Sequence, residues 1–304
     1  MMFRFERRFA LGSLSSRLAA GAALLGLGAA ACANEPPTAS ADGDVGRTQA
    51  VVTIDRTDPA SLDALGSASA VARFISVPAY LDPSRVLIAA GATLDLPPFD
   101  GCSSSDSPDE LAPPLASQDP VEFVEAGDVA IHAADSVSSL VPHAFPTVGS
   151  FASGVLYTTK DREASALPTG VPYLVSASGS TSVSALHLTA DAPPSPSDIQ
   201  VAGVALRDVT EVKTSSPLEL KWAAGEPSDV VYVELLAYDG SPSILCTFRD
   251  ETGQGTISAD TFNGAGNGRL ALHRVRSRHV DGGASPSGDI RFDFQVGASV
   301  EFAK

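Results

Sequence analysis

Apolar and polar side chains alternate along several stretches in the second half of the chain. In residues 218–222, two leucines and Trp222 alternate with a glutamate and a lysine, and residues 244–248 and 290–296 alternate in a similar way. A period of two is typical of strands with one face in the core, so we expect Trp222 to be buried. Residues 230–238 are apolar on both faces over part of their length, which predicts a central strand.

The first half of the chain beyond residue 48 is less regular but also predicts strands. The expected strands are residues 70–76, 85–90, 121–125, 129–133, 154–159, 171–178 and 183–190. Residues 97–120, rich in Pro, Ser and acidic side chains, indicate a long surface loop. The best helix candidate is residues 60–65, with Asp58 as its cap and Pro59 at its first position.

These strands define the expected fold class and its domains. Strands that recur about every 10–15 residues, separated by Gly or Pro turns and without a long helical period, indicate an all-β protein. The proline-rich residues 191–197 indicate an extended linker. We therefore expect two tandem antiparallel β-sandwich domains, immunoglobulin-like, at 49–192 and 198–304.

The first 31 residues are expected to be a secretory signal peptide. Four arginines outweigh Glu6 within the first 17 residues, and residues 18–31 contain only Ala, Gly and Leu. This apolar run is shorter than the roughly 20 residues that a membrane-spanning helix needs. Arg7 and Arg8 also fit a twin-arginine signal, but their flanking residues favour the general secretory route.

The run ends in Ala29-Ala30-Ala31-Cys32, which resembles the processing site of bacterial lipoprotein precursors. The resemblance implies that Cys32 is diacylated and becomes the new N-terminus, although Ala29 stands where Leu is more usual. The alternative is ordinary cleavage after an Ala-x-Ala site. Residues 32–48 are small, acidic and poor in large apolar side chains, which predicts a flexible tether. Ala33 after the cysteine favours the outer membrane within the same resemblance.

Composition excludes some classes of function and leaves others open. The 304 residues are 44% hydrophobic, enough for a packed core, and 36 acidic against 20 basic side chains give a net charge of −16. Nucleic acid is not an expected partner, because phosphate binding needs clustered Lys and Arg. Three Cys and five His are too scattered for a zinc framework, and no phosphate-binding loop, Gly-x-Ser-x-Gly or His-Glu-x-x-His motif occurs. No cofactor or metal is expected.

Two cysteines remain once Cys32 is set aside. Cys102 lies in a Gly- and Ser-rich segment and Cys246 in a row of inward-facing residues. An even number of cysteines in an exported protein indicates a disulfide, which would connect the two halves. The alternative is one exposed and one buried thiol.

A basic cluster is the most conspicuous charged feature of this acidic chain. Arg274, Arg276 and Arg278 fall on one face of an expected strand, and His273 and His279 on the other. The cluster is either a patch that binds anions or a set of cross-strand ion pairs with acidic neighbours such as Glu301 or Asp293. The alternating spacing favours the ion pairs.

The other polar groups suggest little chemistry. The carboxylates of the long loop match no calcium-binding pattern, and a solvated acidic loop is the simpler interpretation. The glycines of residues 264–268 precede no helix, so they predict a turn and not a phosphate cradle. His132, His143 and His187 have no Ser or Cys nucleophile nearby in sequence, which leaves only a triad assembled in space.

The whole pattern resembles a group of bacterial lipoproteins built as two tandem β-domains. The residues that carry the resemblance are the Ala29–Cys32 site, the strands at 218–222, 246–248 and 290–294, and the glycines before Arg269. The resemblance implies no known activity. We expect a non-enzymatic, membrane-anchored cell-envelope protein that acts as an interaction or structural module, with the membrane and an envelope protein or glycan as partners. The alternatives are a carbohydrate- or peptide-binding module and a periplasmic hydrolase.

Overall fold

The computed structural model describes most of the chain from Arg47 onward. The described residues are 47–61, 65–77, 88, 90–91, 93–104, 121–148, 152–159, 162–259, 261–262, 264–282 and 286–304. They lie within one compact unit, Asp44–Lys304. The signal peptide, Cys32 and most of the expected tether and 85–90 strand lie outside them. Among the described residues, no helix is long and apolar enough to cross a membrane.

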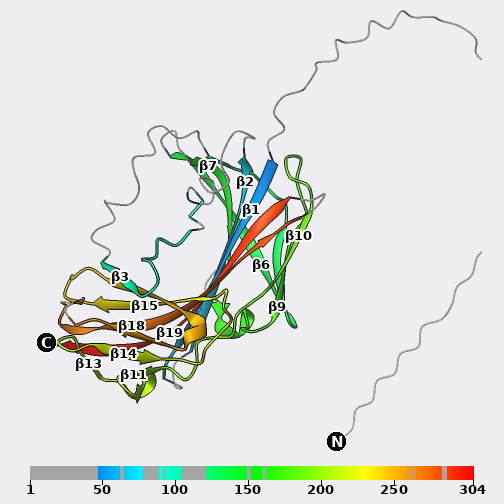
Figure 1. The fold of residues 1–304 in the computed structure, drawn as a ribbon. Helices are drawn as coiled ribbons and strands as arrows, with labels where there is room; N and C mark the ends of the chain where they lie inside the picture. Colours follow the sequence, from blue (N-terminus) through cyan, green and yellow to red (C-terminus); the bar gives the residue numbers. More distant parts are fainter. Residues whose placement is uncertain are drawn as a thin grey trace, which may run out of the picture. The chain divides into compact units, whose positions relative to one another are not determined.

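Four long strands form the centre of this unit. They are β1 (Arg47–Pro59), β2 (Ser67–Val77), β18 (Gly266–Val280) and β19 (Ser287–Ala303). β1 is antiparallel to β2 and parallel to β19, and β18 is antiparallel to β19. Figure 1 shows β1 in blue beside β19 in red. The first and last strands described in the chain are therefore direct neighbours.

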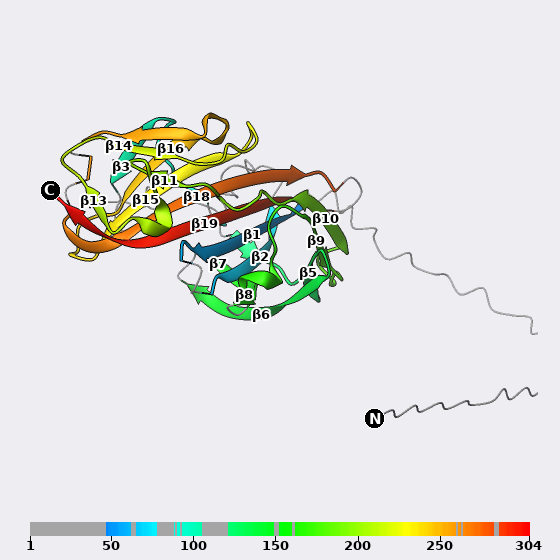
Figure 2. The ribbon, with the colours of Figure 1, turned by 90° about the horizontal axis from the view of Figure 1, so that it is seen from below.

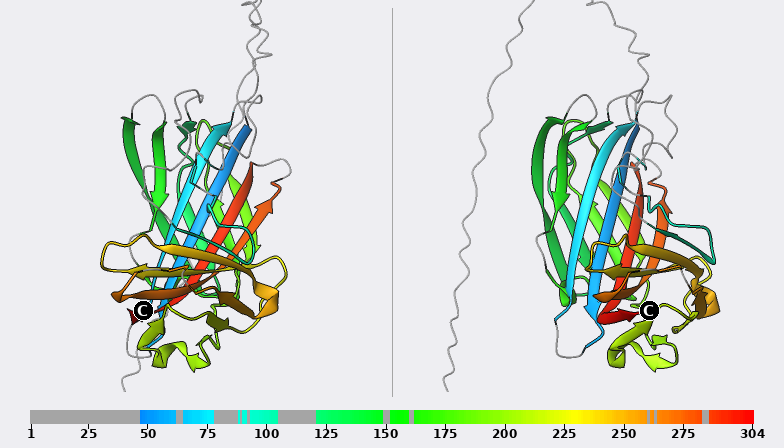
Figure 3. Two further views of the ribbon diagram at one scale, coloured as in Figure 1. Left: turned by 60° about the vertical axis from the view of Figure 1, so that its left-hand side comes forward. Right: turned by 90° about the vertical axis from the view of Figure 1, so that its left-hand side faces the viewer.

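The N-terminal strands extend the main sheet on the β2 side. From its edge the order is β10, β9, β5, β6, β7, β4 and β2, with β8 also paired to β2. Their bounds are β4 (Val121–Phe123), β5 (Val129–Ala133), β6 (Ser136–Val148), β7 (Ala152–Thr158), β8 (Arg162–Glu163), β9 (Pro172–Ala177) and β10 (Leu186–Asp191). Figure 3 shows these green strands standing beside β1 and β2.

This part of the sheet curls until β10 contacts β18 and β19. Gly288 of β19 permits the contact, because a Cβ atom at this position would overlap the side chain of Leu188 on β10. Leu186, Leu188 and Ala190 of β10 alternate with exposed residues and point to the inside of the curl. The alternation in the sequence is thus the direct cause of the one-sided burial of this strand.

The C-terminal strands extend the main sheet on the β18 side. β15 (Val230–Ala237) pairs with β18, β16 (Ile244–Arg249) with β15, and the short β3 (Gly101–Ser104) with β16. β13 (Glu211–Lys213) pairs with the end of β19. A smaller sheet packs alongside, in the order β12 (Val204–Ala205), β11 (Gln200–Val201), β14 (Leu218–Lys221) and β17 (Gln254–Ile257). Figure 2 shows β18 and β19 running from this group into the N-terminal strands.

Two hydrophobic clusters fill the unit. The first combines side chains from residues 50–192 with Ile290, Phe292 and Phe294 of β19. The second combines side chains from residues 199–302 and includes Trp222, which is buried as its strand pattern predicts. β19 therefore contributes to both clusters, through different parts of its length.

The all-β class is confirmed, whereas the details of the sequence prediction need correction. The main sheet runs through both halves, so residues 191–197 do not separate two closed sandwiches, although the two clusters change near this point. The helix cap expected at Asp58 is wrong: β1 continues to Pro59. Sequence alternation also missed β1 and β6, and β3 lies within the expected surface loop.

Candidate functional site

The arginines of β18 are buried in ion pairs and do not form an exposed basic patch. Arg274 is 1% exposed, and its Nε and Nη2 atoms donate to the two carboxylate oxygens of Asp250 at 2.6 and 2.9 Å. Arg276 donates in the same two-point manner to Asp229, at 2.6 Å for both bonds. The hydrogen bonds that Arg276 donates to Asp229 raise the pKa of the Arg276 guanidinium. Arg278, at the edge of the row, lies 3.4 Å from Glu226.

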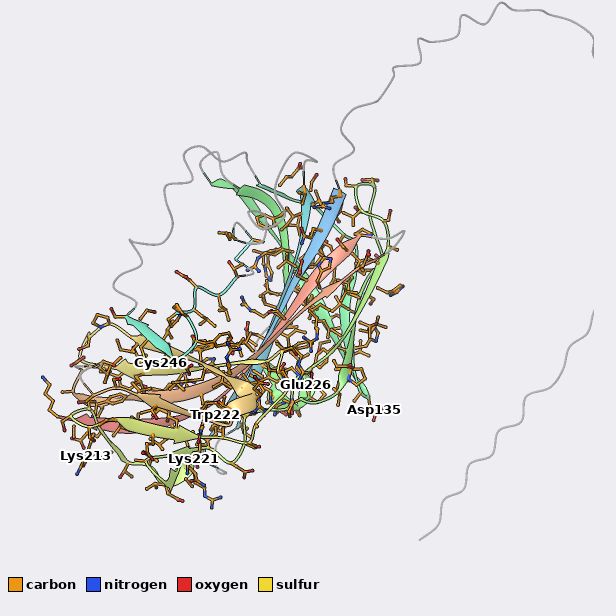
Figure 4. All side chains as sticks on the ribbon, in the orientation of Figure 1. Asp135, Lys213, Lys221, Trp222, Glu226 and Cys246 are labelled. Carbon is orange, nitrogen blue, oxygen red and sulfur yellow. A yellow bond between two sulfur atoms is a disulfide. The ribbon has the colours of Figure 1, made fainter. Side chains whose placement is uncertain are left out.

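These arginines also hold the proline-rich segment against the sheet. Arg274 donates to the backbone oxygens of Pro194 and Ala223 at 3.3 and 2.6 Å, and Arg276 donates to that of Asp191 at 3.4 Å. Figure 4 shows Glu226 near the junction between the two groups of strands. The expected linker is thus fixed to the body by buried cations, which satisfy carbonyl groups that proline-rich backbone leaves unpaired.

Trp222 completes this buried network. Its indole N–H donates to Asp250 Oδ1 at 2.9 Å, so this carboxylate binds Trp222 as well as Arg274. The ring lies 6.0 Å from that of Phe248 between centroids. The only tryptophan of the chain therefore belongs to the second core and offers no exposed platform for a ligand.

Cys102 and Cys246 form a disulfide between β3 and β16. The two residues are directly opposite in the antiparallel register, with their Cα atoms 4.1 Å apart. Figure 4 shows Cys246 among the C-terminal strands, close to β3. The bond fastens the segment of residues 93–104, which we call the strap, to the edge of the main sheet. A cation–π contact of Arg249 with Phe99, 4.5 Å from the ring centroid, adds a second attachment.

A second polar cluster lies on the opposite face of β18. Of its contacts, the sequence predicted only a pairing of this basic strand with Asp293. His273 Nδ1 is 2.8 Å from Asp293 Oδ1, and the hydroxyl of Tyr232 donates to Asp293 Oδ2 at 2.8 Å. The imidazole stacks on the Tyr232 ring, with centroids 4.0 Å apart. His273 is 6% exposed, and its Nε2 atom has no hydrogen-bond partner. Asp293 was one of the acidic partners expected from sequence, whereas Glu301 was not found among the partners of the cluster.

Two carboxylates lie close together on this face of the sheet, because Asp55 of β1 is opposite Asp293 of β19 in the parallel register. Burial raises the pKa of the Asp55 carboxyl, and the charge of Asp293 raises it further. The positive charges of Arg291 and Arg73 lower the pKa of Asp55. The pKa of Arg73 is itself lowered, first by burial and then by the repulsion of Arg291. For Tyr232, burial followed by the Asp293 charge raises the pKa of the phenol.

A cavity of about 330 Å³ lies between the strap and this face of the sheet. Its lining comprises Val51, Val52, Thr93, Leu94, Leu96, Val230, Val275, Ser277, Asp289, Ile290 and Arg291. His273 is not part of the lining. The His273–Asp293 pair is therefore enclosed within the protein, whereas Arg291 reaches the cavity wall.

The other candidates from sequence remain dispersed. His132 lies 3.4 Å from Ser176 on a partly exposed strand face, while His143 and His187 are exposed on β6 and β10. Of the glycines of residues 264–268, which were expected to form a turn before a strand, Gly266 and Gly268 lie within β18 and only Gly264 precedes it; most of the acidic loop lies outside the described residues. In the described part of the chain, no group of three or more His, Cys, Asp or Glu is arranged to hold a metal ion.

Comparison with known proteins adds no relative to this picture. No protein-family model matches the sequence, and no curated protein matches it. The fold and the geometry of the two polar clusters, the disulfide and the cavity are therefore the basis for any function.

Proposed function

We propose that this chain is a non-enzymatic, lipid-anchored cell-envelope protein that acts as an interaction module. The observation that carries the proposal is the Cys102–Cys246 disulfide, which joins an edge strand to the core of the second half. Disulfides of this kind persist in oxidising compartments outside the cytosol. This agrees with the apolar run of residues 18–31 and with the resemblance of the Ala29–Cys32 site to lipoprotein precursors.

The use of the buried charges supports a non-enzymatic role. Arg274 and Arg276 are engaged by Asp250 and Asp229 and hold the backbone of the linker. Such two-point pairs fix geometry and leave few donors for a substrate. The His273 imidazole is enclosed and contacts Asp293 and Tyr232, while His132 lies 3.4 Å from Ser176 on a partly exposed strand face and does not line the cavity beneath the strap. A hydrolase is the less supported alternative for this reason.

Membrane anchoring is tested by changing the lipid attachment site. The wild-type chain is expected to sediment with membranes and to carry a diacylglyceryl group on Cys32, detected by mass spectrometry of the mature N-terminus. A Cys32→Ser variant is expected to move to the soluble exported fraction, whereas a Cys102→Ser variant is expected to stay with the membranes. A Cys32→Ser variant that remains membrane-bound would contradict the proposal.

A second candidate function is binding of a carbohydrate or peptide through exposed aromatic side chains. The observation that favours it is Tyr238, which is 63% exposed at the turn after β15. Aromatic rings stack on sugars and on peptide side chains, and the phenol adds a hydrogen-bonding group at the edge of the ring. Loss of glycan-array or peptide-array binding in a Tyr238→Ser variant, with binding retained in a Val204→Ser variant, would support this function.

A further inference from the structure

The cavity beneath the strap has an apolar wall on both sides. Leu94 and Leu96 contribute from the strap, and Val51, Val230 and Val275 contribute from β1, β15 and β18. Its volume of about 330 Å³ is at the lower end of the range of small-molecule sites, which is about 300–1,000 Å³. A cavity of this size and lining therefore suits a small ligand with a short apolar chain.

The lining also contains polar side chains, namely Thr93, Ser277, Asp289 and Arg291, and Arg291 is the cation among the lining residues. The Asp289 carboxylate is paired within the protein, since Gln49 Nε2 donates to one oxygen at 2.6 Å and His279 Nδ1 lies 3.1 Å from the other. Arg291 makes contacts within the protein as well. A guanidinium has five N–H donors, however, so it accommodates a further acceptor beside those contacts.

We propose that this cavity binds a small apolar molecule that carries one carboxylate, with the apolar body between the strap and the sheet and the carboxylate on Arg291. The pairing follows from the chemistry of the lining, because a guanidinium matches a carboxylate in shape and charge, and Leu94, Leu96 and the valines supply apolar contacts. Ser277 and Thr93 supply hydroxyl groups for the second oxygen. The proposal adds a small-molecule ligand to the interaction module above and does not depend on the lipid anchor.

The strap gives the site a defined roof. β3 pairs with β16 from Gly101 to Ser104, and Asp100 N–H donates to the Thr247 oxygen at 2.8 Å. The disulfide adds a covalent attachment at Cys102. These bonds anchor the strap at the end next to Leu94 and Leu96, which reduces the ordering entropy that opposes binding.

Calorimetric titration with octanoate tests the proposal. The protein is the full chain with Cys32→Ser, which needs no detergent, and 1-octanol serves as the uncharged ligand of equal length. We expect one saturable octanoate site and at least tenfold weaker binding of 1-octanol. Equal affinity for the two ligands, or no saturable binding of octanoate, would overturn the proposal.

Two variants locate the site. Leu96→Trp fills the cavity from the exposed strap, where folding tolerates a larger side chain, and is expected to abolish octanoate binding. Arg291→Met is expected to weaken octanoate at least tenfold and to leave 1-octanol within twofold. The control Lys221→Met removes an equal charge from the exposed face of β14 and is expected to leave both affinities within twofold. Octanoate binding that survives Leu96→Trp would place the ligand elsewhere and refute the assignment.

Discussion

Removal of the Asp250 carboxylate should be among the most damaging single changes in the second half of the protein. Asp250 is fully buried, and Arg274, which it neutralises, is 1% exposed. An Asp250→Ala variant leaves this guanidinium buried without its anion and leaves the Trp222 N–H without its side-chain acceptor. Breaking a buried pair from one side typically costs about 3–5 kcal/mol of the free energy of unfolding.

That loss is large beside the total stability of a folded domain, which is about 5–15 kcal/mol. Urea unfolding followed by Trp222 fluorescence measures it directly, because Trp222 is the only tryptophan and lies in the affected network. The native emission is expected to be blue-shifted and to move to the red on unfolding. An Asp250→Ala protein should unfold at a clearly lower urea concentration.

A matched control and a compensating variant separate the buried charge from general damage. Asp208→Ala breaks an ion pair with Arg207 whose members are both exposed, and should change stability by no more than about 1 kcal/mol. Combining Asp250→Leu with Arg274→Met replaces both charges by apolar groups and should recover part of the loss, because the backbone oxygens of Pro194 and Ala223 still lose their donor. If Asp250→Ala is no more destabilising than Asp208→Ala, the buried pair is not what holds this region together.

Three further predictions concern other parts of the fold. A fragment that starts at Asp198 should lack a cooperative thermal transition, because the apolar β19 residues of the first cluster lose their partners; a cooperative transition would show that the halves fold separately. Replacing both Cys102 and Cys246 with Ser should reduce the free energy of unfolding by about 2–4 kcal/mol, and an unchanged urea midpoint under oxidising conditions would contradict this. Burial, followed by the Asp293 charge, raises the pKa of Asp55 above its ordinary 3.8. The wild type therefore loses stability as the pH rises from about 4 through the folded pKa, and an Asp55→Asn variant should lack this loss. The urea midpoint of the variant should exceed that of the wild type by more at pH 7 than at pH 4. An equal difference at both pH values would refute the assignment.

Several features were readable from the sequence because they depend on local alternation. The pattern of residues 218–222 placed Trp222 in the core, and the spacing of Arg274, Arg276 and Arg278 placed them on one strand face, as the structure has them. The preference for ion pairs over an anion-binding patch also followed from that spacing. Period-two burial is a property of each strand alone, so no knowledge of its neighbours is needed.

The remaining features depend on contacts that are distant in sequence. β1 pairs with β19 across almost the whole chain, and both of its faces are largely buried, so its sequence lacks a clean alternation. Asp58 and Pro59 imitate a helix start that this pairing overrides. The partners of the buried arginines, Asp229 and Asp250, lie in a turn and a 3-10 helix, where no periodic pattern marks them. The cavity requires the strap to cross the sheet, which local patterns do not indicate.

The parallel pairing of β1 with β19 has a consequence for biosynthesis. The N-terminal half leaves the ribosome first, yet Ile290, Phe292 and Phe294 of its core belong to the 17-residue strand β19. Until that strand arrives, β1 presents an unpaired edge and an incomplete apolar surface, which are the features that favour association with other chains. The first core is thus completed only after β19 has been synthesised, and chaperones that shield strand edges would act on the chain during this interval. A truncation that removes β19 would, for the same reason, damage the half of the protein that is made first.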